Sequence, residues 1–204
     1  MALIAGSVVA VRHYSLINVF TSIVANAWER LVEIKLPKEC QNSTFIRGDP
    51  VVVAFENGDS TEIKGGMVVE YKKEEGLLTY EEDIYDEEKV RMRSFARFPV
   101  SLYADYKVVE EGGHKKNFAL VKDISEFGIM LYSTESHFKG LRLNLDIYLT
   151  REILNLTAEI VRKVEHDGYI EYGLRIKHNG PFVFTKIKNY VRKSQEELTS
   201  KFSS

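Results

Sequence analysis

The sequence contains one cysteine, four prolines and a formal net charge of only −2 over 204 residues. A lone Cys40 excludes an internal disulfide framework, a zinc site built from several cysteines and an iron–sulfur cluster. So small a net charge gives no sign of a nucleic-acid partner held by bulk electrostatics. Hydrophobic residues make up 44% of the chain and charged residues 28%, which are globular proportions. We therefore expect a globular chain of one or two domains in a reducing cytoplasm.

Long apolar runs are absent as well. The N-terminal segment 1–11 (MALIAGSVVAV) is apolar, but no basic residue precedes it, and Gly6 and Ser7 interrupt it. A secretory signal needs a basic region before its apolar stretch, and a membrane-spanning helix needs about 18 apolar residues in a row. We expect a buried strand here, no transmembrane segment in the chain, and a cytoplasmic location.

Catalytic motifs are also absent. The chain has no HExxH pair, no GxSxG elbow, no Walker A loop and no GxGxxG turn. The five histidines are scattered, with no pair at the spacing of metal ligands: His13, His114, His137, His166 and His178. We therefore predict that the protein is not an enzyme, with no catalytic residues, no metal and no cofactor.

Charge is distributed unevenly along the chain. Residues 1–90 carry 9 basic and 16 acidic residues, whereas residues 91–204 carry 19 basic and 14 acidic. The densest acidic run, 81–88 (EEDIYDEE), ends just before the sign changes, and such a run is typical of a solvated connector. We therefore predict two domains, 1–90 and 91–204, with the boundary near residue 90.

Both halves have the hydrophobic pattern of β-strands. Residues 31–36 largely alternate apolar and polar side chains, and a buried run at 51–55 is followed at once by Asn57-Gly58, a hairpin signal. In the second half, 141–149 alternates almost perfectly, and the runs 153–164 and 169–176 are joined across Asp167-Gly168, predicted as a type I′ turn. From Phe182 onward the apolar spacing becomes helical. The pattern predicts an all-β fold of two small barrels with a C-terminal α-helix.

Two short motifs flank the first predicted strand of the second half. Arg93 and Arg97 form an RxxxR, and after 25 intervening residues Asp123, Ser125 and Gly128 form a DxSxxG. Each motif alone is weak, because arginine pairs occur by chance and Asp, Ser and Gly are common turn residues. Their order and spacing, upstream of a barrel pattern, make the pair informative.

Together these motifs resemble the PilZ family of cyclic di-GMP receptors. A third element agrees, since Gly173 stands between an aromatic and an apolar residue in EYGLRI (171–176), as in the late barrel strand of that family. The resemblance implies a six-stranded PilZ barrel over 91–204. It extends more weakly to residues 1–90, which resemble the split-barrel-like N-terminal (PilZN-like) domain of two-domain, flagellar-brake-type members.

The chemistry of these side chains suits cyclic di-GMP, which has two phosphates and two guanines. Guanidinium groups fork onto phosphate oxygens and onto the O6 and N7 of guanine. The Asp123 carboxylate would accept hydrogen bonds from the N1–H and N2 amino group of guanine, an edge that adenine lacks. Ser125 would add a hydroxyl contact, and Gly128 would let the chain pass close to the base.

The resemblance also predicts details of the site and the output. Many members have two adjacent arginines at the start of RxxxR, whereas here Met92 precedes Arg93 and Arg91 stands one residue further back. Met92 favours one ligand per site, although Arg91 could reach the same place. We expect ligand-driven rearrangement of the two domains to control a protein partner, such as flagellar motor or exopolysaccharide machinery. The alternatives are a PilZ-like adaptor that binds no nucleotide and, less in keeping with the charge, a single-strand nucleic-acid-binding barrel.

Overall fold

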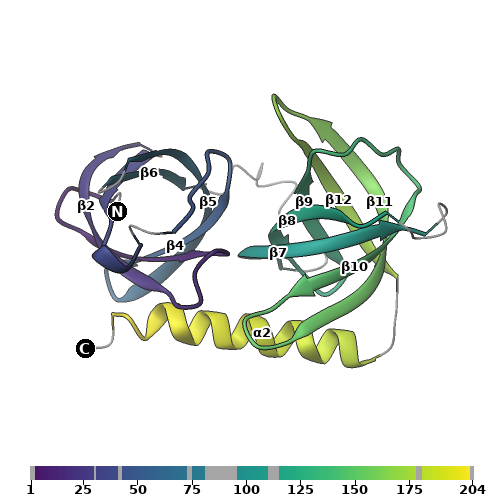
Figure 1. Ribbon diagram of the computed structural model, residues 1–204. Coiled ribbons are helices and arrows are strands. Elements are labelled where there is room, and N and C mark those ends of the chain that lie inside the picture. The colour runs from purple at the N-terminus through teal and green to yellow at the C-terminus, as the bar shows by residue number, and fades with distance from the viewer. Residues whose placement is uncertain are drawn as a thin grey trace. The chain divides into compact units, whose positions relative to one another are not determined.

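The structure is a computed structural model that describes residues 3–29, 31–40, 43–72, 75–80, 96–109, 115–177 and 181–202. It contains two six-stranded barrels and a C-terminal helix (Figure 1). The all-β fold of two small barrels with a terminal helix, predicted from the alternating pattern, is confirmed.

The first barrel is built entirely from antiparallel neighbours, in the order β1-β2-β3-β6-β5-β4. Its strands are β1 (Val8–His13), β2 (Phe20–Trp28), β3 (Leu31–Lys35), β4 (Pro50–Asn57), β5 (Ser60–Lys72) and β6 (Glu75–Tyr80), with a short 3-10 helix η1 (Lys38–Cys40) after β3. Pairing of β1 with β4 closes the barrel. Its interior is apolar and includes the fully buried Cys40, so the lone cysteine packs as a small hydrophobic residue.

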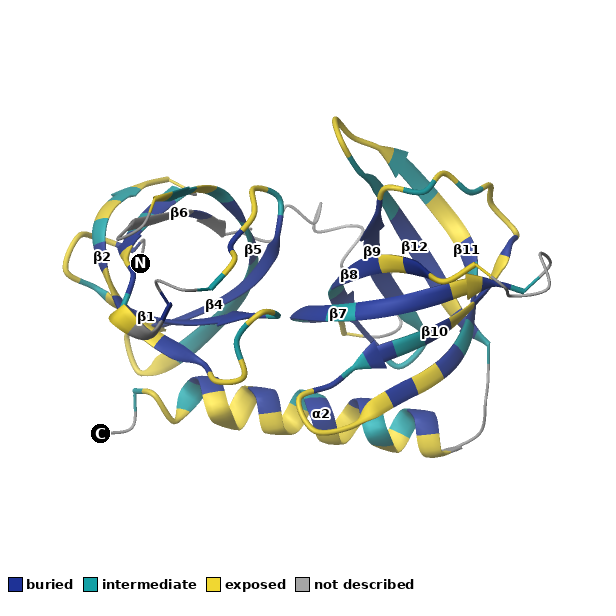
Figure 2. Cartoon of the chain, in the orientation of Figure 1, coloured by how far each residue is buried: buried dark blue, intermediate teal, exposed yellow. Residues whose placement is uncertain are grey.

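The second barrel has the strand order β10-β11-β12-β9-β8-β7. Its strands are β7 (Phe98–Val108), β8 (Asn117–Ile124), β9 (Gly128–Ser133), β10 (Arg142–Tyr148), β11 (Ile153–Glu165) and β12 (Ile170–Lys177). Successive side chains of a strand point to opposite faces. Along β10, Leu143, Leu145 and Ile147 are therefore buried, whereas Arg142 and Asn144 are exposed (Figure 2).

The C-terminal helix α2 (Pro181–Thr199) has one buried stripe and one exposed face (Figure 2). Its buried residues recur every three or four positions, as on one side of an α-helix: Val183, Ile187, Tyr190, Ser194 and Leu198. The helical spacing read from Phe182 onward is thus confirmed. No helix within the described residues is long and apolar enough to span a membrane.

Two predicted turns differ from the structure in detail. The β4–β5 hairpin pairs Asn57 with Ser60, so its two loop residues are Gly58 and Asp59 rather than Asn57-Gly58. In the β11–β12 hairpin the His166 N–H donates to the Tyr169 carbonyl oxygen at 3.0 Å, so Asp167 and Gly168 form the turn as predicted, but only Gly168 has a positive φ, of 86°. A type I′ turn needs positive φ at both central residues, so that part of the prediction is wrong.

The chain divides by its internal contacts into two compact units. One combines Met1–Ser94 with Pro99–Ser101 and Lys193–Ser204, and the other combines Phe95–Phe98 with Leu102–Arg192. Strand β7 and helix α2 therefore contribute residues to both units. The predicted boundary near residue 90 lies outside the described residues, and the division into 1–90 and 91–204 stays a prediction.

Candidate functional site

The DxSxxG motif forms the turn between β8 and β9. The Ser125 N–H donates to the Gly128 carbonyl oxygen at 2.8 Å, and the Gly128 N–H donates to Ser125 Oγ at 3.0 Å. Both Asp123 and Ser125 are buried, with exposed fractions of 5% and 8%. The serine hydroxyl is therefore used to shape the turn, as small polar residues do in tight loops.

Gly128 is required by a neighbouring strand. A Cβ at this position would lie 3.1 Å from the Leu174 carbonyl oxygen on β12, closer than carbon and oxygen normally approach. The Ile176 N–H also donates to the Phe127 carbonyl oxygen at 2.8 Å, which ties the turn to the same strand. The structure thus gives Gly128 a packing role that the sequence did not predict, beside its predicted closeness to a ligand.

Arg97 and Asp123, one from each motif, meet in the structure. Arg97 Nη1 lies 3.2 Å from Asp123 Oδ2 and 3.5 Å from Asp123 Oδ1. Arg97 precedes β7 and Asp123 lies near the end of β8, so the barrel brings together residues 26 positions apart. The Arg97 side chain is 30% exposed and the Asp123 side chain 7%. The pair joins a buried anion to a cation that water still reaches.

The other predicted site residues have different outcomes. Arg91, Met92 and Arg93 lie outside the described residues, so their place stays a prediction. Gly173 lies on β12, where its Cα is paired with Met130 of β9. Met130 is paired in turn with Asp123 of β8. Gly173 and Asp123 are therefore two strands apart in one row across the sheet.

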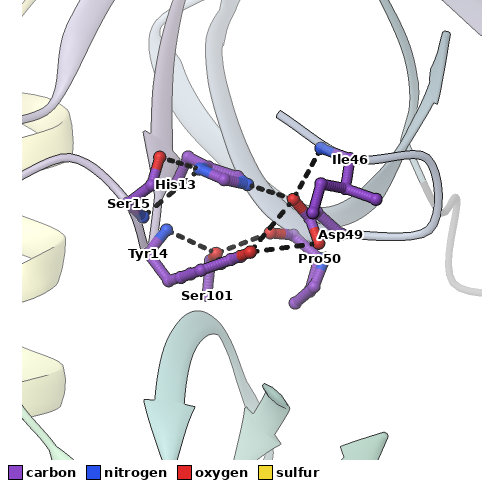
Figure 3. Close-up of polar contacts among 7 residues, drawn as sticks. All are labelled: His13, Tyr14, Ser15, Ile46, Asp49, Pro50 and Ser101. Atoms are coloured by element: carbon purple, nitrogen blue, oxygen red, sulfur yellow. Dashed lines mark hydrogen bonds and ion pairs between the residues drawn. The ribbon is translucent and has the colours of Figure 1, made fainter. Parts of the chain in front are cut away.

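A second polar cluster, in the unit that holds the first barrel, was not predicted from the sequence (Figure 3). His13 Nε2 lies 3.1 Å from Asp49 Oδ2, and His13 Nδ1 lies 2.7 Å from Ser15 Oγ. The Ser15 N–H also donates to His13 Nδ1 at 3.3 Å. Because Nδ1 accepts that bond, the ring proton lies on Nε2 and is donated to Asp49.

Further donors complete this cluster. The Asp49 carboxylate accepts hydrogen bonds from the Tyr14 hydroxyl at 3.2 Å and the Ile46 N–H at 2.8 Å. The Ser101 hydroxyl accepts from the Tyr14 N–H at 2.9 Å and donates to the Pro50 carbonyl oxygen at 2.5 Å (Figure 3). Burial and the negative charge of Asp49 raise the pKa of Tyr14 to about 12.

A hydrogen-bonded row of serine, histidine and carboxylate also occurs in nucleophilic catalysis. Here His13 is fully buried and its Nδ1 is occupied by the backbone of Ser15, so the row holds loop segments together. Within the described ranges, no three His, Cys, Asp or Glu side chains gather as metal ligands. Neither cluster offers a built metal site.

Comparisons with known proteins can now be set beside this geometry. The sequence profile of the PilZ domain family matches residues 92–193, which is half of the chain. No curated protein sequence matches.

Several solved structures are similar to the chain. The Bacillus subtilis inhibitor of motility MotI/DgrA is 15% identical, with 96% of this chain and 98% of that chain covered and a TM-score of 0.45. Escherichia coli YcgR in complex with c-di-GMP is 10% identical (97% and 88% covered, TM-score 0.47). Borreliella burgdorferi PlzA in complex with c-di-GMP is 11% identical (92% and 88% covered, TM-score 0.38). By the match of the PilZ profile to residues 92–193, the chain belongs to the PilZ domain family.

Proposed function

We propose that this protein is a non-enzymatic cyclic di-GMP receptor that controls a protein partner. One observation carries the proposal: Arg97 of the RxxxR motif lies 3.2 Å from Asp123 of the DxSxxG motif. Two motifs that are weak separately in the sequence therefore meet at one place on a PilZ barrel. Membership of the PilZ family supports the same function, as do the c-di-GMP complexes of YcgR and PlzA.

Ligand binding in this proposal is an exchange of partners. The Asp123 carboxylate is paired with the Arg97 guanidinium. Guanine offers N1–H and an amino group, which would replace those donors on Asp123. Arg97 would then turn its planar fork to a phosphate or to guanine O6 and N7. Because Arg97 is 30% exposed, this movement requires little repacking.

The rest of the mechanism concerns the segment before β7. We propose that Arg91 and Arg93 close over the ligand, that Met92 favours one ligand per site, and that the ligand clamps the segment 88–99. A ligand shifts a domain equilibrium only if it binds one arrangement better than the other. Contacts from this segment would supply that difference and rearrange domains 1–90 and 91–204. The output would be motility or exopolysaccharide machinery.

The alternative is a PilZ-like adaptor that binds no nucleotide. One observation favours it: the Asp123 carboxylate is paired with the Arg97 guanidinium of the same barrel, so the two charges compensate each other. In that case Arg97 and Asp123 form a structural ion pair. The two functions differ in whether cyclic di-GMP binds.

Isothermal titration calorimetry with cyclic di-GMP and cyclic di-AMP tests the proposal. We expect cyclic di-GMP to bind, with one ligand per site, and cyclic di-AMP to bind far more weakly because adenine lacks the N1–H donor. Hydrogen exchange should slow over residues 88–99 on saturation. Absence of binding would favour the adaptor, whereas binding without protection of 88–99 would remove only the clamping of this segment.

A further inference from the structure

We propose that helix α2 positions the DxSxxG turn of the nucleotide site through Phe184 and Lys188, and that nucleotide binding in return fastens the helix to this turn. The proposal rests on the proposed function and adds to it an element outside both motifs. Helix α2 follows the last strand of the second barrel, and its residues up to Arg192 belong to the unit that contains this barrel. Phe184, Lys188 and the turn are therefore parts of one compact unit.

Glu126 and Phe127 form the tip of the turn. The Ser125 N–H donates to the Gly128 carbonyl oxygen, so the chain reverses through the two residues between them. The motif gives neither of these residues a role, because DxSxxG leaves both positions open. Each of them nevertheless contacts a side chain of α2.

The two side chains of α2 contact the tip from one face of the helix. The ring centroids of Phe127 and Phe184 are 5.1 Å apart and their planes meet at 69°, the edge-to-face arrangement that aromatic pairs favour. Lys188 Nζ lies 2.9 Å from Glu126 Oε1. Phe184 and Lys188 are four residues apart, so they lie on the same side of the helix. One face of α2 thus holds both residues of the tip.

The backbone of the same turn is fixed to β12. The Ile176 N–H donates to the Phe127 carbonyl oxygen at 2.8 Å. A strand therefore holds the backbone of Phe127, and a helix holds its side chain. Asp123 and Ser125, the proposed contacts of the nucleotide, lie within four residues of Phe127, so their positions depend on that of the tip. Ligand-binding groups need such support, because a looseness of about 1 Å already weakens their contacts.

Helix α2 is also attached to the barrel at a place other than this turn. Lys186 Nζ lies 3.2 Å from Glu152 Oε2, in the connection between β10 and β11, and donates to the Ile153 carbonyl oxygen at 3.3 Å. The helix is therefore a support against which the turn is held. Lys186 and Lys188 make a matched pair, since Lys188 binds the DxSxxG turn and Lys186 binds another connection.

Coupling between a ligand and a structural element is reciprocal. If α2 favours the turn geometry that binds the nucleotide, bound nucleotide favours the docked helix by the same factor. The amides of α2 should therefore exchange more slowly when the nucleotide is bound. Because α2 continues past Arg192 into the other unit, the helix is a covalent route from the nucleotide site to the residues grouped with the first barrel.

Calorimetry with cyclic di-GMP tests the ion pair. Lys188 is 66% exposed and Glu126 31%, so the pair is weak, and we expect Lys188→Ala and Glu126→Gln each to reduce affinity about twofold. The sign for Glu126→Gln is diagnostic, because loss of a negative charge alone would strengthen binding of a dianionic ligand. The double variant should lose no more affinity than either single variant. Lys186→Ala is the matched control and should leave affinity unchanged.

Phe184→Ala tests the ring contact and should weaken binding about fivefold. Phe184→Leu, which keeps the apolar bulk, should recover part of the affinity. Phe182→Ala removes a phenylalanine of the same helix that is 80% exposed, and as the control it should bind like the wild type. Hydrogen exchange over residues 182–192 should slow on saturation in the wild type and in Phe182→Ala, and much less in Phe184→Ala.

Three results would overturn the proposal in distinguishable ways. If the wild type binds and both Phe184→Ala and Glu126→Gln bind as tightly as Phe182→Ala, α2 does not position the turn, and the proposed function still stands. If exchange in α2 stays the same when the wild type is saturated, binding does not fasten the helix. If the wild type does not bind cyclic di-GMP, the proposed function fails and the role of α2 fails with it.

Discussion

Asp49 in the first barrel and Asp123 in the second are both nearly buried, and the two differ in the donors that hold them. Asp49 in the first barrel is 4% exposed and accepts hydrogen bonds from a histidine ring, a tyrosine hydroxyl and a backbone N–H. Asp123 in the second is 5% exposed, and its charged partner is the Arg97 guanidinium, which is 30% exposed. The two carboxylates are therefore equally buried but are held by different kinds of donor. Donors fixed by the fold keep Asp49 in place, whereas in the proposed function the partly exposed Arg97 leaves Asp123 for the nucleotide.

The largest effect should come from removing the fixed carboxylate. Asp49→Ala leaves the ring N–H of His13, the Tyr14 hydroxyl and the Ile46 N–H without their acceptor, so we expect the free energy of unfolding to fall by about 3 kcal/mol. Urea denaturation measures it. Asp59→Ala, at an exposed turn of the same barrel, is the control and should change stability by under about 0.5 kcal/mol. An unchanged stability for Asp49→Ala would remove the contrast between the two aspartates.

Asp123→Ala should weaken ligand binding strongly and change stability little, the reverse of Asp49→Ala. The free energy of unfolding should change by only about 1 kcal/mol, because Arg97 is left partly in water. The affinity for cyclic di-GMP should fall about a hundredfold, the loss of a charged acceptor for two guanine donors. Calorimetry with both nucleotides should show that this variant binds cyclic di-AMP about as well as cyclic di-GMP. A large loss of stability with unchanged affinity would make Asp123 structural, like Asp49.

Arg97→Ala should weaken binding about ten- to a hundredfold, since a forked contact to phosphate or guanine is worth roughly 1–3 kcal/mol. Lys107→Ala on β7, an exposed cation of the same barrel, controls for the loss of one positive charge. The β-fold should persist by circular dichroism. Equal affinity of the Arg97→Ala and Lys107→Ala variants would exclude Arg97 from the site.

The sequence predicted what depends on local patterning. Alternation in 141–149 gave β10, and the spacing of RxxxR and DxSxxG pointed to residues that the barrel brings together. The ion pair between Arg97 and Asp123 was not predicted. The two motifs predict which residues contact a ligand, but they do not predict which of these residues pair with each other. The pair His13 and Asp49 was missed because 36 residues separate them, and only the closure of β1 on β4 unites them.

Backbone irregularities were also beyond sequence patterning. A register shift between Ile160 and Arg162 makes Val161 a bulge on β11, and hydrophobic alternation does not predict it because the exposed Val161 is itself apolar. Turn type failed for a similar reason, since Asp167-Gly168 has the composition of a type I′ turn but only Gly168 has the positive φ that this type needs at both residues.

The smallest effect concerns alkaline pH. The folded pKa of Tyr14 is about 12, above its ordinary value of 10.0, chiefly because of burial and then the charge of Asp49. The neutral phenol is thus favoured by folding, and this contribution is present below pH 10 and lost as the pH rises from 10 to 12. Urea denaturation across that range should show a shallower loss of stability for Tyr14→Phe than for the wild type. If stability falls equally with pH in the wild type and in Tyr14→Phe, Tyr14 is not coupled to the Asp49 cluster.

The central claim is that Asp123 is held by an exchangeable cation, and nuclear magnetic resonance of the Arg97 guanidinium tests it most directly. The Arg97 Nε and Nη signals can be assigned by comparison with Arg97→Lys and followed during titration with cyclic di-GMP. We predict that they shift and saturate together with binding, as Arg97 leaves Asp123 for the nucleotide, while the ring signals of His13 in the first barrel keep their hydrogen-bonded positions. Binding of cyclic di-GMP with unchanged Arg97 signals would contradict the account, because Arg97 would then be a fixed partner of Asp123.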